Sequence, residues 1–220
     1  MGRATESPEH PYVAILGGAK VSDKIGVFEN LIEKVDVFLV GGGMAFAFLK
    51  AGGGEIGESL LEEGSVETAQ EILASAGRAG RRVVLPSDVV IAREASAEAE
   101  SRIADARRIP KGWKGLDVGP ASIEAFAAEV SGASMIVWNG PLGVFELEPF
   151  AAGTMKIARA VAARTASGAI SIIGGGDSAA AVVLAGVADS ITHISTGGGA
   201  SLMFLEGKAL PAVEVLSEAH

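Results

Sequence analysis

Several residue types and patterns are missing from this 220-residue chain, and each absence removes a class of protein. There is no cysteine, so disulfides and thiolate-bound metals are excluded, and the composition fits the reducing cytoplasm, where we expect the protein to be located. No uninterrupted apolar run approaches the roughly 20 residues of a membrane-spanning helix, so no membrane association is expected. The 3 histidines form no pattern of metal ligands.

Basic residues are also scarce, because 18 Lys and Arg stand against 27 Asp and Glu, a net charge of −9. A nucleic-acid-binding surface needs clustered Lys and Arg, so no nucleic-acid partner is expected. An acidic domain that holds a polyanion must use local positive groups, and Lys20 and Lys24 are the only lysines inside a glycine turn. A second, highly charged phosphate ester would find no evident basic docking patch in this sequence.

Glycine, in contrast, is abundant, with 30 residues, and many of them cluster in five turns after short apolar runs. The turns read GGAKVSDK (17–24), GGGMAF (41–46), NGPLGVFE (139–146), GGGDS (174–178) and STGGGAS (195–201). Such a turn lets backbone N–H groups converge on an anion, and a helix that follows it points the positive end of its dipole the same way. Several of these turns on one sheet edge predict a cleft that holds phosphates.

Strand-like and helix-like patterns alternate along the chain. The expected strands are residues 12–16, 37–40, 82–85, 89–92, 135–139, 170–173 and 193–195. The expected helices are one that starts at Ser22 and then residues 44–50, 65–79, 122–130, 154–166, 178–185 and 200–206. This alternation predicts the α/β class, as a three-layer Rossmann-like domain with a parallel sheet and helices on both faces. Ligands of such sheets bind at the carboxyl ends of the strands, where all five glycine turns fall.

The chain shows no internal linker, so we expect one domain over residues 11–209. Residues 1–10 lack the apolar core of a signal peptide and are interpreted as a tag or linker remnant. The stretch 94–115 is charged and interrupted by Pro110 and Gly112, so it is expected to be peripheral.

The turn at residues 17–24 is the most informative of the five. Lys20 and Lys24 are four residues apart, so both can lie on one face at the start of a helix that Ser22 caps. Two positive charges at a helix N-terminus are unfavourable unless an anion offsets them, which favours phosphate binding over a pair of solvated lysines. The spacing is not that of a Walker A loop.

Two further turns offer anion and metal sites. Three glycines followed by Asp177 suit a loop beneath a phosphate chain, with Asp177 on Mg²⁺ directly or through water. The alternative is that Asp177 caps its helix, and the two roles are compatible. The turn 195–201 opens the last helix, whose N–H groups suit an anion, although a close contact between helix and sheet that needs glycine explains it nearly as well.

The segment 139–146 is apolar and ends in Glu146, which suits a slot for a base with Glu146 accepting hydrogen bonds from ribose hydroxyls. An ordinary loop explains this segment equally well. The glycines at 41–43 would let a flat base lie against the backbone, although a tight turn fits them equally. The dinucleotide fingerprint G-x-G-x-x-G is missing, which leaves a dehydrogenase poorly supported.

Six segments taken together resemble one family. They are AILGGAKVSDK (14–24), VGGGMAF (40–46), GLDVGP (115–120), VWNGPLGVFE (137–146), IIGGGDS (172–178) and STGGGASL (195–202). In this order and spacing they resemble the nucleotide-binding, C-terminal half of phosphoglycerate kinase, from about residue 11 to residue 216. The resemblance implies reversible phosphoryl transfer between ATP and the carboxylate of 3-phosphoglycerate, a glycolytic step. Such chemistry needs positioning and charge neutralisation, and a carboxylate nucleophile needs no general base.

The resemblance also implies a role for individual residues. Those that would bind ADP or ATP are Gly18, Ala19, Gly42 and Gly43 at the adenine, Leu116, Pro141 and Val144 in the same slot, Glu146 at the ribose, Asn139 near the phosphates or ribose, and Lys24, Gly175, Gly176 and Ser178 at the phosphates. Asp177 would hold Mg²⁺. Lys20 would contact the transferring phosphoryl group, together with the N–H groups of Gly198 and Gly199.

The sequence departs from the family in one large respect. Family members have an N-terminal domain that binds 3-phosphoglycerate, and nothing in the chain corresponds to it, while residues 210–220 resemble the segment that returns to that domain. We therefore expect a monomer that binds ADP or ATP with Mg²⁺ and is inactive without the N-terminal domain. The alternative is a stand-alone nucleotide-binding or scaffolding module without turnover.

Overall fold

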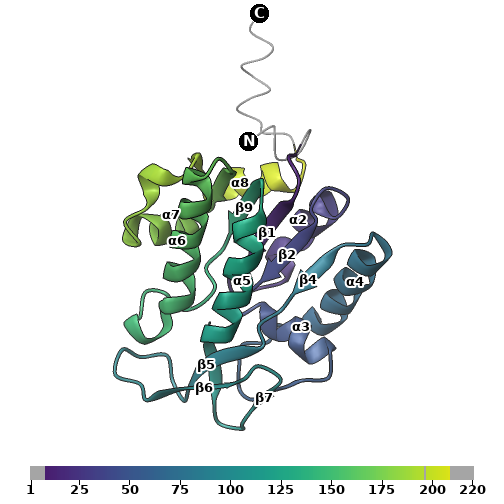
Figure 1. The fold of residues 1–220 in the computed structure, drawn as a ribbon. Helices are drawn as coiled ribbons and strands as arrows, with labels where there is room; N and C mark the ends of the chain where they lie inside the picture. Colours follow the sequence, from purple (N-terminus) through teal and green to yellow (C-terminus); the bar gives the residue numbers. More distant parts are fainter. Residues whose placement is uncertain (1–7, 196, 209–220) are drawn as a thin grey trace, which may run out of the picture.

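The computed structural model describes residues 8–195 and 197–208, which form a sheet between two layers of helices (Figure 1). The central sheet has six parallel strands in the order β11-β10-β9-β1-β2-β4. In chain order they are β1 (Tyr12–Leu16), β2 (Val37–Val40), β4 (Arg82–Val84), β9 (Met135–Asn139), β10 (Ile170–Gly174) and β11 (His193–Ser195). The predicted α/β class and parallel sheet are therefore confirmed.

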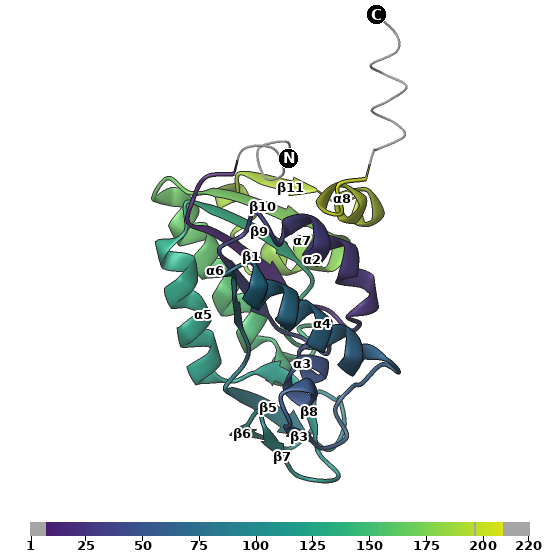
Figure 2. The same cartoon turned by 90° about the vertical axis from the view of Figure 1, so that its right-hand side faces the viewer.

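Both faces of the sheet are covered, as Figure 2 shows. On β1, Tyr12 and Leu16 belong to one hydrophobic core and Val13 and Ile15 to another, as expected of a strand that is buried on both sides. The helices packed in the first core are α2 (Ile25–Leu31), α3 (Ala45–Ala51), α4 (Ser65–Arg78) and α8 (Gly198–Leu205). Those in the second are α5 (Pro120–Gly132), α6 (Ala152–Ala166) and α7 (Gly176–Leu184). In the part of the chain that the structure describes, no helix is long and apolar enough to cross a membrane.

The strand order reverses once, between β1 and β9. From β1 the chain proceeds outward to β2 and β4, and then returns to β9 on the other side of β1 before it continues to β10 and β11. Loops that leave neighbouring strands in opposite directions leave a crevice at such a switch point. The carboxyl ends of β1 and β9 are therefore the place where the fold can hold a ligand.

A second, smaller layer of strands lies below the main sheet in Figure 1. It consists of an antiparallel sheet of β5 (Asp88–Ala92), β6 (Ser101–Asp105) and β8 (Lys114–Val118), and of the pair β3 (Glu55–Ile56) and β7 (Arg108–Ile109). Its core includes Phe46, Ile56, Ile91 and Ile109. The stretch 94–115, for which no strand was predicted, thus contributes to this layer. Because β6 is mostly exposed, its charged residues conceal the strand pattern.

The expectation that Ser22 caps a helix is wrong. Ser22 lies in the short 3-10 helix η1 (Ser22–Lys24), whose N-cap is Val21. The Ser22 hydroxyl instead donates to Glu62 Oε1 at 2.7 Å, in the segment before α4. Two other 3-10 turns, η2 (Glu148–Phe150) and η3 (Ala188–Ser190), flank α6 and β11.

The predictions for the two chain ends fall largely outside the described residues. Residues 1–7 and the C-terminal tail 210–220 belong to the part that is not described, so both interpretations stay predictions. Of residues 8–10, His10 has a contact with the domain, because its Nδ1 lies 2.6 Å from Asp36 Oδ2.

Candidate functional site

The glycine turns meet at one edge of the sheet, because parallel strands have their carboxyl ends on the same side. The loops after β1 and β9 touch there: Gly17 N donates to Asn139 O at 3.0 Å, and Gly18 N donates to Pro141 O at 2.9 Å. A Cβ on Gly17 would lie 2.1 Å from Pro141 O, so only glycine permits this approach. The floor of the crevice is thus a contact between two backbones.

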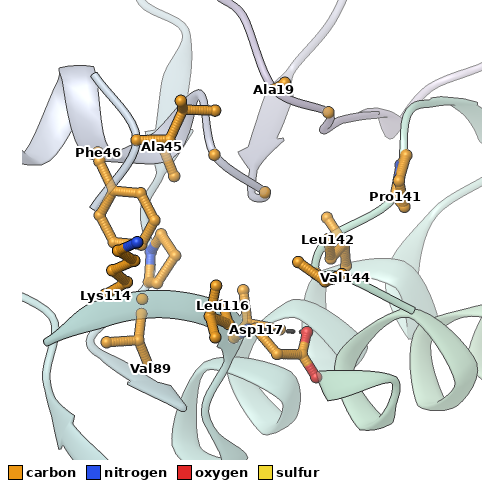
Figure 3. Close-up of a pocket in the computed structure, with 18 of the residues that line it drawn as sticks. Ala19, Ala45, Phe46, Val89, Lys114, Leu116, Asp117, Pro141, Leu142 and Val144 are labelled. Atoms are coloured by element: carbon orange, nitrogen blue, oxygen red, sulfur yellow. Dashed lines mark hydrogen bonds between the residues drawn. The ribbon is translucent and has the colours of Figure 1, made fainter. Parts of the chain in front are cut away.

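Two hollows adjoin above this floor. The first, which we call the apolar slot, has a volume of about 440 Å³ and lies between β8 and the loops after β1, β2 and β9 (Figure 3). The second, which we call the polar pocket, has a volume of about 260 Å³ and lies among the loops after β1, β9 and β10. Gly18, Ala19, Pro141 and Asp177 line both hollows. A ligand with an apolar end and a charged end could therefore occupy both.

The apolar slot gathers the residues predicted around a base and ribose. Eight of them line it: Gly18, Ala19, Gly42, Gly43, Leu116, Pro141, Val144 and Glu146. Asn139, predicted near the phosphates or ribose, lines the polar pocket instead. Figure 3 shows Phe46 and Lys114 on one side of the slot and Pro141 and Val144 on the other. The structure thus places together residues from four segments of the sequence, although no ligand tests their roles.

The polar pocket contains a lysine held in a fixed position. Lys24 is half-buried, and its Nζ donates to Asn139 Oδ1. The Asn139 amide donates in turn to Gly174 O at 2.8 Å, which fixes the amide between the ends of β9 and β10. Burial holds the pKa of Lys24 below its ordinary value, although nearby carboxylates, including that of Asp177, act in the opposite direction. A phosphate beside this ammonium would favour its charged form.

Ser178, Gly175 and Gly176 line the same pocket at the start of α7. Ser178 is fully buried, and its Oγ accepts a hydrogen bond from Gly140 N at 2.7 Å. Ser178 therefore ties the turn after β9 to the first turn of α7. Gly175 has a φ of +100°, a conformation that L side chains rarely adopt. These contacts direct the start of α7 toward the pocket, and the first N–H groups of a helix have no partner within the helix itself.

Asp177 is exposed on the second residue of α7 and lines both hollows. The N-cap of α7 is Gly175, and no side chain of the described residues caps this helix, so the interpretation of Asp177 as a cap is wrong. Among those residues, no group of three or more His, Asp or Glu side chains could hold a metal ion. Mg²⁺ binds readily through one or two carboxylates together with substrate phosphates. Asp177 therefore fits a cation that arrives with a ligand better than a permanently bound one.

The three residues predicted at the transferring phosphoryl group are placed differently. Lys20 is exposed, lines the polar pocket and precedes η1, so it does not share a helix face with Lys24. Gly198 and Gly199 begin α8, which follows the edge strand β11. From the same helix, Leu202 lines the polar pocket.

The sequence interpretation missed Asp117, which lines the apolar slot beside Leu116. Its carboxylate accepts hydrogen bonds from Gly153 N at 2.7 Å and from Val118 N at 2.9 Å. Burial raises the pKa of Asp117 to about 7, although both hydrogen bonds act to lower it. The signal that could have identified it is a carboxylate between the apolar residues Leu116 and Val118 of β8.

Other residues that line the slot were not among the predicted site residues. Ala45, Phe46, Leu142 and Gly143 lie in two of the predicted glycine turns, whereas Glu58, Leu60, Pro86, Val89 and Lys114 come from segments in which no site was predicted. Several of them lie in or next to the small second layer of strands, whose packing against α3 forms one side of the slot.

These features define an open α/β protein of the Rossmann-like class with a cleft at its switch point. The family model of phosphoglycerate kinase matches residues 1–208, and the chain therefore belongs to the phosphoglycerate kinase family. The family resemblance carried by the six glycine-rich segments is thus confirmed.

Individual relatives agree with this assignment. The chain is 55% identical over 220 residues to the phosphoglycerate kinase of Chloroflexus aurantiacus. The match covers 100% of this chain and 55% of that protein. The solved structure of phosphoglycerate kinase from Coxiella burnetii matches with a TM-score of 0.93 and 44% identity, over 99% of this chain and 55% of that one. The solved structure of phosphoglycerate kinase from Pyrococcus horikoshii matches with a TM-score of 0.78 and 33% identity, and the match covers 98% of this chain and 54% of that one. The chain therefore spans about half the length of these relatives.

Proposed function

We propose that this chain is the nucleotide-binding half of a phosphoglycerate kinase. It would bind ADP or ATP with Mg²⁺ for reversible phosphoryl transfer between ATP and 3-phosphoglycerate. The observation that carries the proposal is the adjoining pair of hollows at the switch point, in a member of this family. One hollow suits a flat, apolar base and the other suits a chain of phosphates.

The base would lie in the apolar slot between glycine backbone and aliphatic side chains. Gly42 lies so close to the loop after β1 that a Cβ would be 2.7 Å from Gly18 N, and its φ of +65° also favours glycine. Across the slot, Leu116 and Val144 offer apolar contacts. The Glu146 carboxylate is exposed at the slot, where it can accept hydrogen bonds from ribose hydroxyls.

The phosphates would extend into the polar pocket past the residues that line both hollows. There Lys24 provides a positive charge on a fixed side chain, and the start of α7 at Gly175 and Gly176 provides N–H groups. Asp177 would hold Mg²⁺, which neutralises negative charge on the phosphates when it is bound. Lys20 is exposed at the mouth of the pocket, where it can follow the transferring phosphoryl group.

Turnover by this chain alone is not expected. Phosphoryl transfer depends on positioning, so both substrates must be held in line in a site from which water is excluded. The chain spans 55% of its Chloroflexus relative, and the remaining part of such relatives would supply the 3-phosphoglycerate site. Mixing the chain with the separately produced N-terminal half of that relative, in an assay coupled to ADP formation, should restore activity. A scaffolding module would bind nucleotide and show no such gain.

Calorimetric titration of the chain with ADP, with and without Mg²⁺, tests the binding itself. We expect binding in both cases, and tighter binding with Mg²⁺. Asp177→Asn should remove most of this difference, because an amide is a poor ligand for Mg²⁺. The matched control is Asp189→Asn in η3, another exposed aspartate that lines neither hollow.

The possible results separate the parts of the proposal. A chain that binds no ADP under either condition would overturn the nucleotide site. Equal dependence on Mg²⁺ in the wild type and in Asp177→Asn would remove the metal role from Asp177 and leave the nucleotide site in place.

A further inference from the structure

We propose that Asp117 is a positioning residue: its ionised carboxylate holds one wall of the apolar slot in place, so that nucleotide affinity depends on its protonation. The inference rests on the proposed nucleotide binding and adds a residue that would act on the ligand only through its neighbours. It would make this half of the protein sensitive to pH in the neutral range.

The Asp117 carboxylate is tightly enclosed. The residue is 3% exposed, and a Cβ added to Gly143 or to Gly153 would lie 2.2 Å or 2.4 Å from its Oδ1. Oδ2 accepts a hydrogen bond from Gly153 N at 2.7 Å, and Oδ1 accepts one from Val118 N at 2.9 Å. These contacts fasten the first turn of α6 to strand β8.

The same contacts connect Asp117 to the slot. Gly143 and Val144 line the slot, and Val144 N donates to Leu116 O at 2.9 Å, so the loop after β9 is attached to β8 immediately beside Asp117. Figure 3 shows Leu116 and Val144 at the slot, with the Asp117 carboxylate below them. A shift of this carboxylate would therefore move the wall that the base contacts.

Protonation would disturb this arrangement. The ionised carboxylate can accept from both N–H groups, whereas the neutral acid carries an O–H that needs an acceptor of its own. The negative form is also favoured next to the N-terminus of α6, because of the helix dipole. Since burial raises the pKa of Asp117 to about 7, both forms are populated near neutral pH.

In the described part of the chain, the elements around the slot carry several charged side chains. They include Lys50 on α3, Glu58 before α4, Asp88 on β5, Lys114 on β8, Glu146 and Glu148 in the segment before α6, Lys156, Arg159 and Arg164 on α6, and Asp177 on α7. None of these is a histidine, the side chain that usually changes its charge near neutral pH. The described histidines, His10 and His193, lie before β1 and in β11.

The expected effect follows from the ionised fraction. If only the ionised form keeps the wall in place, the apparent dissociation constant rises in proportion as that fraction falls. For a pKa of about 7, the fraction falls from roughly nine-tenths at pH 8 to roughly one-tenth at pH 6. We therefore expect MgADP to bind about 10-fold more weakly at pH 6 than at pH 8 through this group alone.

Calorimetric titrations with MgADP between pH 6 and pH 8 test this. ADP itself titrates in this range, and its titration affects the wild type and Asp117→Asn alike. The informative quantity is therefore the difference between the two proteins in how the dissociation constant depends on pH. At pH 8, Asp117→Asn should bind MgADP more weakly than the wild type does. It should also lack the additional 10-fold loss of affinity between pH 8 and pH 6. A merely structural defect would lower affinity without removing that dependence.

Asp88→Asn is the matched control. Asp88 also accepts hydrogen bonds from a helix N-terminus, from Ala121 N at 3.1 Å and Ser122 N at 2.8 Å, but it does not line the apolar slot. This variant should keep the pH dependence of the wild type. In case Asp117→Asn does not fold, the ¹³C resonance of the Asp117 carboxyl in the wild type reports the ionisation directly, and saturating MgADP should lower its midpoint.

Three results would overturn the inference. Two of them are equal pH profiles for the wild type and Asp117→Asn, and a carboxyl resonance whose midpoint does not respond to MgADP; both leave the proposed nucleotide site intact. The third is a wild type that binds no MgADP at any pH, which overturns the proposed function and this inference with it.

Discussion

Replacing Gly17 with alanine is a direct test of how the cleft is built. Gly17 is not among the glycines with positive φ, so alanine meets no conformational obstacle there. Its Cβ, however, would lie 2.1 Å from Pro141 O and 2.6 Å from Gly140 O. Both are backbone atoms, which cannot rotate away as the end of a flexible side chain can. The loops after β1 and β9 would have to separate.

The magnitude can be estimated from the contacts that are lost. Overpacking of a close-packed region costs about 1–3 kcal/mol. Separation would also break the hydrogen bonds from Gly17 N and Gly18 N across the switch point, each worth about 1 kcal/mol. We expect the free energy of unfolding to fall by about 3–5 kcal/mol, which corresponds to a decrease in Tm of about 6–20 °C for a domain of this size. Binding of MgADP should be lost as well, because both hollows share this floor.

Urea unfolding followed by circular dichroism measures the change, with Gly176→Ala as the matched control. A Cβ on Gly176 meets nothing within 4 Å, and Gly176 lies in the first turn of α7 without a positive φ. The control should therefore be as stable as the wild type or slightly more stable, since alanine favours helix. If Gly17→Ala unfolds at the same urea concentration as the wild type and binds MgADP as tightly, the tight backbone contact is not what shapes the cleft.

Three further outcomes are expected. Glu146→Ala should weaken calorimetric binding of ADP more than binding of its 2′,3′-dideoxy analogue, and an equal loss for both ligands would remove Glu146 from the ribose. Tyr12→Phe should raise the free energy of unfolding by about 1 kcal/mol, because the buried hydroxyl has no partner among the described residues; a decrease would reveal one. Because the pKa of Asp117 is raised from 3.8 to about 7, this group adds stability to the folded state that is fully present below pH 3.8 and is lost as the pH rises through about 7. The free energy of unfolding, measured with urea from pH 4 to pH 8, should therefore decline less for Asp117→Asn than for the wild type.

The central strands of the main sheet could be predicted because they are buried on both faces. A strand such as β1, with every residue buried, appears in the sequence as a continuous apolar run, and the glycine turn after it marks its carboxyl end. Parallel pairing then places all such turns at one edge. Most candidate residues of the cleft lie in these turns, and the resemblance to the family supplied their individual roles.

The second layer of strands could not be predicted in this way. Strand β6 has four exposed residues out of five, so it shows no apolar run, and β3 and β7 have only two residues each. These short elements depend on tertiary packing around Phe46 and Ile91 rather than on local preference. The side of the apolar slot that these strands support could therefore not be predicted from the sequence.

Contacts between segments that are distant in the sequence could not be predicted either. The pattern around Ser22 is that of a helix cap, yet its hydroxyl donates to Glu62, which is 40 residues away. Asp117 stands in a segment from which only Leu116 was selected, on the family resemblance, and nothing local shows that Gly153 N reaches the carboxylate. Local sequence indicates which residue types are available, whereas the strand order decides which of them meet.

The two lysines of the first glycine turn illustrate what the structure adds to the chemistry. In the sequence Lys20 and Lys24 form an equivalent pair, four residues apart. In the structure Lys24 is half-buried and anchored to Asn139, while Lys20 is exposed beside the same pocket. A half-buried, anchored ammonium suits phosphates that keep their position, because its partial desolvation is a cost that a nearby anion offsets. An exposed and flexible one suits a group that moves, because it can change partners while it remains charged. This difference supports the separate roles proposed for the two side chains in phosphoryl transfer.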